Sequence, residues 1–160
     1  MGWCVANREH NIRRLALQMF EVTKRAWLAA QREKFKGGYD LSESEFLALD
    51  ALENVRSLSV GDLRKHVGVL PAQMSRVIKA LEQRYDEKLV LCAINPHDKR
   101  KIDVSITPVG RKAVEAYRRA KIASSIKALN AISDHDLAVF SQILDKISHA
   151  GEKATAGKPA

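Results

Sequence analysis

The stretch SVGDLRKHVGVLPAQMSRVIKALE, residues 59–82, decides the fold of this 160-residue chain. Its first half predicts a short helix that begins at the capping residue Ser59 and ends at Gly68, where glycine suits a left-handed cap. Pro71 then fits the first position of a second helix, because the N–H that proline lacks has no helical partner there. A short helix, a tight turn and a second helix are the layout of a helix-turn-helix.

The second of these helices has one apolar face and one face of short or polar side chains. The apolar positions are Met74, Val77, Ile78 and Leu81, and the residues left facing outward are Ala72, Gln73, Ser75, Arg76 and Lys79. A helix that enters the major groove of DNA needs side chains on its first two turns that can approach and read base edges. The outward face meets that requirement.

After this helix, the spacing of apolar residues changes from the helical period to the alternation typical of strands. Residues 89–94 are a β-rich run, and Ile102, Val104 and Ile106 alternate with polar residues as in a half-buried strand. The turn-forming, basic segment 95–100 lies between the two runs, so we expect a two-stranded β-hairpin wing. The whole pattern predicts a mainly α fold of the winged helix-turn-helix type.

Long amphipathic helices are expected on both sides of this lobe. Their apolar stripes, which step by three and four residues, include Ile12, Leu15 and Met19 in the first segment and Leu137, Phe140, Leu144 and Ile147 in the last. The breadth of the first stripe favours contact with another subunit. We therefore expect one domain over 1–150, with dimerisation helices at 8–36 and 108–149, a winged-helix lobe at 41–107 and a disordered tail at 151–160.

The basic charge of the chain is concentrated in its middle. Lys and Arg number 27 against 19 Asp and Glu, which gives a formal net charge of +8. Residues 56–112 hold 12 basic and 6 acidic side chains, or +6, whereas residues 1–55 sum to 0 and residues 113–160 to +2. Because such an excess attracts polyanions and surrounds the predicted helix-turn-helix, duplex DNA is the expected partner.

We expect the outward helix face to read bases. Arginine pairs with guanine and glutamine with adenine, so Arg76 and Gln73 are the expected readers, and Ala72 suits a thymine methyl group. For Ser75 and Gln73, a contact to the phosphate backbone or no contact with DNA at all is equally expected. Lys79 is expected to contact a phosphate.

The hairpin tip is expected to position the protein on DNA. Lys99, Arg100 and Lys101 can reach phosphates or an adjacent minor groove, with Asp98 holding the arginine by a charge-assisted bond. Contacts of this kind fix register and orientation more than they specify sequence.

At these positions the sequence resembles the MarR family of bacterial transcriptional regulators. The resemblance rests on residues 41–46, 59–63 and 74–82, and on Asp-Lys-Arg at 98–100 followed by Ile-Thr-Pro-Val-Gly at 106–110. It implies a cytoplasmic homodimer whose recognition helices enter successive major grooves of a pseudo-palindromic operator. It also implies a small-molecule or oxidant effector that releases the DNA.

Three other interpretations stay open at this stage. The face at 72–79 and the tip at 99–101 could be solvated surfaces without a ligand. The winged fold could serve protein interaction after losing DNA binding, since segment 84–88 is longer than in the family and alters the base of the wing. A small enzyme using Cys92 or a histidine is the third, but no catalytic motif stands out, so we expect no enzyme.

The remaining candidate sites depend on isolated residues. Cys4 and Cys92 are candidate redox sensors, although a strand cysteine also suits a small buried apolar residue. The five histidines lack ligand spacing, so we expect neither metal nor cofactor. Trp27, Phe35 and Tyr39 could line an effector pocket or form plain core. No apolar run approaches about 18 residues, so no membrane segment is expected.

Overall fold

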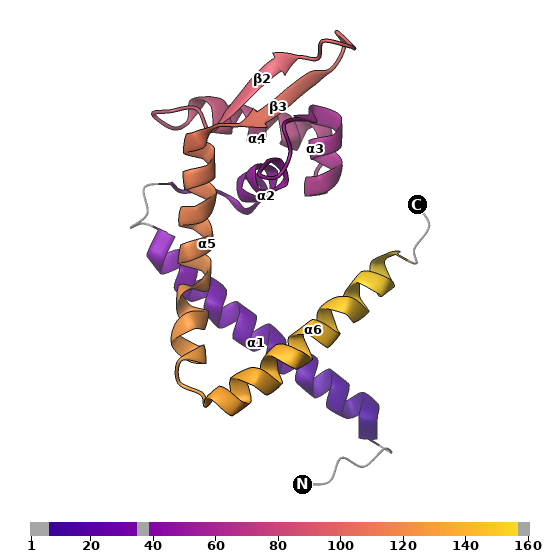
Figure 1. The fold of residues 1–160 in the computed structure, drawn as a ribbon, viewed down its shortest axis with the longest axis vertical. Coiled ribbons are helices and arrows are strands. Elements are labelled where there is room, and N and C mark those ends of the chain that lie inside the picture. Colours follow the sequence, from indigo (N-terminus) through magenta and orange to yellow (C-terminus); the bar gives the residue numbers. More distant parts are fainter. Residues whose placement is uncertain (1–6, 35–38, 157–160) are drawn as a thin grey trace. The chain divides into compact units, whose positions relative to one another are not determined.

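The computed structural model describes residues 7–34 and 39–156 (Figure 1). Along the chain the elements are α1 (Arg8–Lys34), α2 (Glu43–Leu52), β1 (Leu58–Ser59), α3 (Val60–Val67), α4 (Pro71–Gln83), β2 (Val90–Ile94), β3 (Ile102–Ile106), α5 (Pro108–Leu129) and α6 (Asp134–Ala156). Contacts group the chain into two units, residues 1–122 and 123–160. The mainly helical winged helix-turn-helix is confirmed, and no helix in the described part is long and apolar enough to cross a membrane.

Local capping fixes where the helices of the lobe begin and end. Ser42 Oγ accepts a hydrogen bond from the Glu45 N–H, and Glu45 Oε2 accepts one from the Ser42 N–H at 2.6 Å, which completes a capping box on α2. Ser59 caps α3 in the same sense through the Asp62 N–H, and Gly68 ends α3 in the left-handed region at φ 72°. The predicted start at Ser59 and the predicted glycine cap are confirmed.

The recognition helix α4 begins without a side-chain cap. Its N-cap residue is Leu70, which makes no capping hydrogen bond and is 73% exposed, while Pro71 occupies the first turn. The helix therefore starts on backbone geometry and proline alone.

Replacing Leu70 with serine is expected to raise the free energy of unfolding by about 1 kcal/mol, because the hydroxyl can accept an orphan N–H of the first turn. Chemical denaturation of Leu70→Ser against Leu70→Ala measures this, since both variants remove the exposed leucine and only serine adds an acceptor. Equal stability of the two variants would show that this helix start gains nothing from a cap.

The sheet has one strand more than the predicted hairpin. β2 and β3 pair antiparallel in the register Cys92 opposite Val104, and β1 adds to the free edge of β3 with Leu58 opposite Val104. The predicted two-stranded wing is confirmed as β2 and β3. The strand β1 was missed, because a two-residue strand has no period to detect and is fixed by its long-range partner. The resulting order is β1-β3-β2.

One hydrophobic core joins α2, α3, α4, the sheet and the first turns of α5. Its fully buried large side chains are Leu41, Leu49, Leu52, Leu63, Met74, Leu81, Leu89, Val90, Val104 and Val114. Phe46 stacks on Tyr117 with ring centroids 4.3 Å apart, which fixes α2 against α5. The core places the outward face of α4 and the wing on the rigid part of the lobe.

The wing joins α5 through a tightly packed threonine and glycine. Thr107 Oγ1 donates to the Lys88 carbonyl at 2.8 Å and accepts from the Gly110 N–H at 2.9 Å. A β-carbon on Gly110 would lie 2.2 Å from the Leu89 carbonyl oxygen, so only glycine fits this approach. This explains the Thr-x-x-Gly pattern at residues 107–110 in physical terms.

Large apolar side chains remain exposed on α1 and α6. On α1 they include Ile12, Leu15 and Met19, and on α6 they include Phe140, Leu144 and Ile147, all at least 40% exposed, while Leu137 is half-buried. The helix α6 extends to Ala156, so part of the tail that we expected to be disordered from residue 151 is helical. Residues 157–160 lie outside the described part.

Candidate nucleic-acid interface

The structure places the outward residues of α4 together on one exposed helical face. Ala72, Gln73, Ser75, Arg76 and Lys79 are all exposed, whereas Met74, Val77, Ile78 and Leu81 on the opposite face are buried. Arg76 and Lys79 form no hydrogen bond or ion pair with other described residues. Their charges are therefore open to an incoming anion or base edge.

Two of these polar residues are engaged within the lobe. Ser75 Oγ donates to the Pro71 carbonyl at 3.2 Å, one turn earlier in its own helix. Gln73 Nε2 donates to Ser44 Oγ of α2 at 3.4 Å. The contact between Gln73 and Ser44 could not be predicted from sequence, because the two residues lie 29 positions apart in the chain.

The tip of the wing is ordered by side chains that bind backbone groups. Asn95 Oδ1 accepts from the N–H groups of His97 and Asp98, and Asp98 Oδ1 accepts from the Arg100 N–H at 3.1 Å. Asp98 Oδ2 lies 3.6 Å from Lys101 Nζ. The expected charge-assisted bond between Asp98 and Arg100 is present at the arginine backbone N–H, and the same carboxylate also pairs with Lys101.

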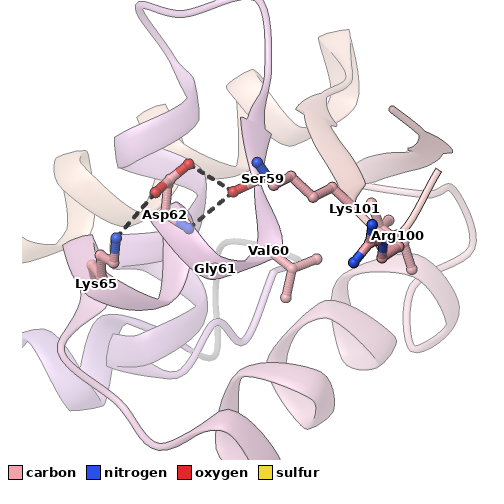
Figure 2. A pocket seen from close by; sticks show the side chains of 8 residues that line it. Ser59, Val60, Gly61, Asp62, Lys65, Arg100 and Lys101 are labelled. Carbon is pink, nitrogen blue, oxygen red and sulfur yellow. Dashed lines mark hydrogen bonds and ion pairs between the residues drawn. The ribbon is translucent and has the colours of Figure 1, made fainter. Parts of the chain in front are cut away.

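A hollow of about 510 Å³ lies between the wing and the start of α3 (Figure 2). Its lining residues are Ser59, Val60, Gly61, Asp62, Lys65, Arg100, Lys101 and Ile102. Three of these are basic and one is acidic. The hollow thus extends the basic surface of the wing onto α3.

Asp62 and Lys65 form the α3 side of this hollow. The hydrogen bond from Ser59 Oγ lowers the pKa of the Asp62 carboxyl, and Lys65, whose Nζ lies 3.5 Å from Asp62 Oδ1, lowers that pKa further. Figure 2 shows this hydrogen-bonded group on the helix, with Arg100 and Lys101 reaching the hollow from the wing. Lys65 was missed from sequence, because only the fold brings it opposite the wing tip.

A second hollow, of about 390 Å³, lies among α1, α2 and α5, and we call it the aromatic pocket. Its lining residues are Thr23, Ala26, Trp27, Glu43, Phe46, Leu47, Tyr117, Arg118, Lys121 and Ile122. Lys121 Nζ lies 6.0 Å from the centre of the Trp27 ring and 5.3 Å from that of Tyr117. The pocket therefore combines aromatic faces with two positive charges, of which Arg118 is paired with Asp50 and Glu53 and Lys121 lies against the aromatic rings.

The three aromatic residues predicted for an effector pocket have different positions. Trp27 lines the aromatic pocket. Tyr39 instead packs beside Tyr85, with ring centroids 6.0 Å apart, and Phe35 lies outside the described residues.

Cys92 on β2 sits in surroundings that oppose thiolate formation. Burial raises its pKa from the ordinary 9.0 to about 11, and the nearby Glu82 carboxylate raises it as well. A redox-sensing cysteine needs a low pKa, so this site disfavours Cys92 as a sensor. Cys4 lies outside the described residues.

We expect Cys92 to react with iodoacetamide at pH 8 about 100-fold more slowly than a thiol of ordinary pKa, because only the thiolate attacks. Mass spectrometry of the Cys4→Ser variant measures the rate without interference from the other cysteine, and unfolding in urea should restore it. Alkylation in the folded protein at the urea rate would contradict the buried, neutral thiol.

Comparison with known proteins adds two findings on the sequence, and the structure adds one on metals. The model of the MarR family matches residues 41–102. No curated protein sequence matches the chain. Among the described residues, no group of three or more His, Cys, Asp and Glu side chains could hold a metal ion.

Several solved structures share the fold. A MarR family protein from Bacillus stearothermophilus is 16% identical with a TM-score of 0.75, covering 91% of this chain and 98% of that one. FabT from Streptococcus pneumoniae, solved in complex with DNA, is 16% identical with a TM-score of 0.66, covering 89% and 99%. BpsR from Bordetella bronchiseptica, whose DNA binding is regulated by 6-hydroxynicotinic acid, is 25% identical with a TM-score of 0.52, covering 82% and 98%.

Proposed function

This chain belongs to the MarR family through its winged helix at residues 41–102, and from that premise we propose that it is a cytoplasmic transcriptional regulator that binds duplex DNA. One observation carries the proposal. The exposed face of α4 presents Arg76 and Lys79 without internal partners in the described structure, and the wing adds further exposed basic residues. The opposite face of α4 packs into the core, so these basic side chains are left available to a polyanion.

We assign different roles to the two basic elements. On α4, Arg76 reads guanine and Gln73 adenine, with Ala72 and Ser75 beside them in the major groove. Lys79 meets a phosphate of the backbone.

On the wing, Lys99, Arg100 and Lys101 position the protein on the sugar-phosphate backbone or in the adjacent minor groove. Lys65 joins them from the other side of the hollow shown in Figure 2. The hollow is thus the proposed binding site for one stretch of the DNA backbone.

The operator-binding form is proposed to be a homodimer. The exposed apolar side chains of α1 and α6 are too many for a helix that faces water on all sides, and a second copy of the chain would cover them. Ile12, Leu15 and Met19 on α1, and Leu137, Phe140, Leu144 and Ile147 on α6, are the proposed dimer contacts. Two recognition helices about 34–36 Å apart would then enter successive major grooves of a pseudo-palindrome.

The aromatic pocket is the proposed effector site. Trp27, Phe46 and Tyr117 offer flat apolar faces, and Lys121 offers a charge that suits a carboxylate. A planar aromatic carboxylate combines both properties. BpsR, whose DNA binding responds to 6-hydroxynicotinic acid, is a precedent for that chemical class in a protein of this fold.

Two arginine variants test the assigned roles. Arg76→Ala is expected to cost about 1–3 kcal/mol at one base pair of the operator and to relax the preference there, because a base contact is lost. Arg100→Ala should weaken binding to all sequences by a similar factor and leave the preference unchanged.

Fluorescence anisotropy with the operator and a set of single-base variants measures both effects. Should both alanine variants bind the operator as tightly as the parent, neither residue contacts DNA as proposed.

A further inference from the structure

The first turn of α2 lies between the aromatic pocket and the recognition helix. Glu43 and Phe46 line the pocket. The two residues between them, Ser44 and Glu45, are hydrogen-bonded to side chains at the two ends of α4. Four consecutive residues therefore touch the proposed effector site and the proposed DNA reader.

The contact at the start of α4 involves a proposed base reader. Gln73 Nε2 donates to Ser44 Oγ at 3.4 Å. Because this amide is also the group that would pair with adenine, the position of Ser44 influences where Gln73 points.

The contact at the end of α4 is stronger and more buried. Arg84, the C-cap residue of α4, donates from Nη2 to Glu45 Oε2 at 3.0 Å and to the Asp40 carbonyl at 2.5 Å. Its guanidinium also lies 4.8 Å from the centre of the Tyr85 ring. Glu45 is only 2% exposed, and the same carboxylate oxygen completes the capping box with Ser42.

A buried carboxylate that loses its cation is costly, so α2 and the end of α4 must move together. Gln83 is the last helical residue of α4, and Arg84 and Tyr85 follow it directly. Arg84 donates to Glu45, and the Tyr85 hydroxyl donates to the Asp40 carbonyl at 3.1 Å, so these two residues hold the end of α4 to the start of α2.

The pocket side of the turn carries a charge that an anionic ligand would meet. Glu43 lines the pocket, and after burial its charge is the next cause that raises the pKa of the Tyr117 hydroxyl. A carboxylate bound at Lys121 would therefore lie in the field of Glu43, and like charges repel at this range. The repulsion acts directly on the first turn of α2.

We propose that the first turn of α2 couples the aromatic pocket to the recognition helix, through Ser44 to Gln73 at its start and through Glu45 to Arg84 at its end. Arg84 is a positioning residue in this scheme and does not contact DNA. The proposal rests on the proposed function, because it describes how an occupied pocket lowers the affinity of α4 for the operator. By linkage, operator binding lowers the affinity for the ligand by the same factor.

The experiment compares operator affinity with and without 6-hydroxynicotinic acid as the probe. For the parent we expect the dissociation constant of the operator to rise about tenfold at saturating probe, within the usual range of coupling. Isothermal titration calorimetry of the probe into the DNA-free protein measures probe binding independently of operator binding. A probe that does not bind, or that binds without changing operator affinity, overturns the proposal, while operator binding by the parent still upholds the proposed function.

The decisive variant is Ser44→Ala combined with Arg84→Gln. We expect it to bind the probe as the parent does, but with a probe effect on operator affinity of less than about twofold. Its operator affinity should fall, with the slope against salt concentration unchanged, because no phosphate contact is removed. The variant in which Arg84→Lys replaces Arg84→Gln should regain part of the effect of the probe on operator affinity, because lysine keeps a positive charge near Glu45.

The matched control is Arg111→Gln. Arg111 Nη1 donates to the Glu53 carbonyl at the other end of α2, at 2.5 Å, so the variant removes the same kind of group without touching α4. We expect it to keep the parent's tenfold effect. The proposal is overturned if the Ser44→Ala, Arg84→Gln variant keeps that effect as well, or if Arg111→Gln loses it equally.

Discussion

Gly110→Ala is expected to lower the free energy of unfolding by about 3 kcal/mol, because the added methyl group has no space. Its β-carbon would lie 2.2 Å from the Leu89 carbonyl oxygen and 2.8 Å from Ile106 Cγ1. The first of these is a backbone atom that cannot rotate away. The wing and α5 would have to separate, and the Thr107 hydroxyl would lose its geometry. Urea denaturation followed by circular dichroism measures the change.

Gly61→Ala is the matched control within the lobe. Its β-carbon would meet nothing closer than Ser59 Oγ at 3.8 Å, and the residue lies inside α3. Alanine there is expected to stabilise the protein by about 0.5–1 kcal/mol, since it is the better helix former. If Gly110→Ala unfolds at the parent's urea midpoint, the close approach of wing and α5 is not a feature of the folded protein.

Raising salt from 50 to 200 mM is expected to weaken operator binding by on the order of 10⁵, because each phosphate contact releases counterions. The proposed backbone contacts in each protomer are Lys65, Lys79, Lys99, Arg100 and Lys101. Two protomers would then neutralise about ten phosphates, which corresponds to a slope of about −9 in log affinity against log salt. Anisotropy titrations over this salt range measure the slope.

The variant Arg100→Gln with Lys101→Gln should make that slope shallower by about 3 to 4, since it removes two contacts from each protomer. Lys127→Gln, in the second unit, changes the charge without touching the winged helix and should leave the slope as it is. If the parent shows no salt-dependent binding to duplex DNA, the chain is instead a protein-interaction module that has lost DNA binding.

Local features of the fold could be predicted from sequence because neighbouring residues determine them. The cap at Ser59 and the glycine end at Gly68 each act within one helical turn, and both appear as expected. The spacing of apolar residues likewise predicted which side chains of α4 and of the wing strands are buried, because it too depends on neighbouring residues. These elements make up most of the lobe.

The features that were missed all depend on residues far apart in the chain. The strand β1 exists only through its pairing with β3, and Lys65 joins the wing only across a hollow. Arg84 reaches Glu45 over 39 residues, so no local pattern in the sequence indicates this pair. Side chains that meet only after folding leave no periodic trace in the sequence.

Selection of bound sequences from random duplex DNA would show whether the chain is a sequence-specific dimeric regulator. We expect an enriched pseudo-palindrome whose half-sites are centred about 10–10.5 base pairs apart, one helical turn, because two recognition helices would enter successive major grooves. Recovery of no enriched sequence, with binding that is equal for all duplexes or absent, would contradict a sequence-specific dimeric regulator.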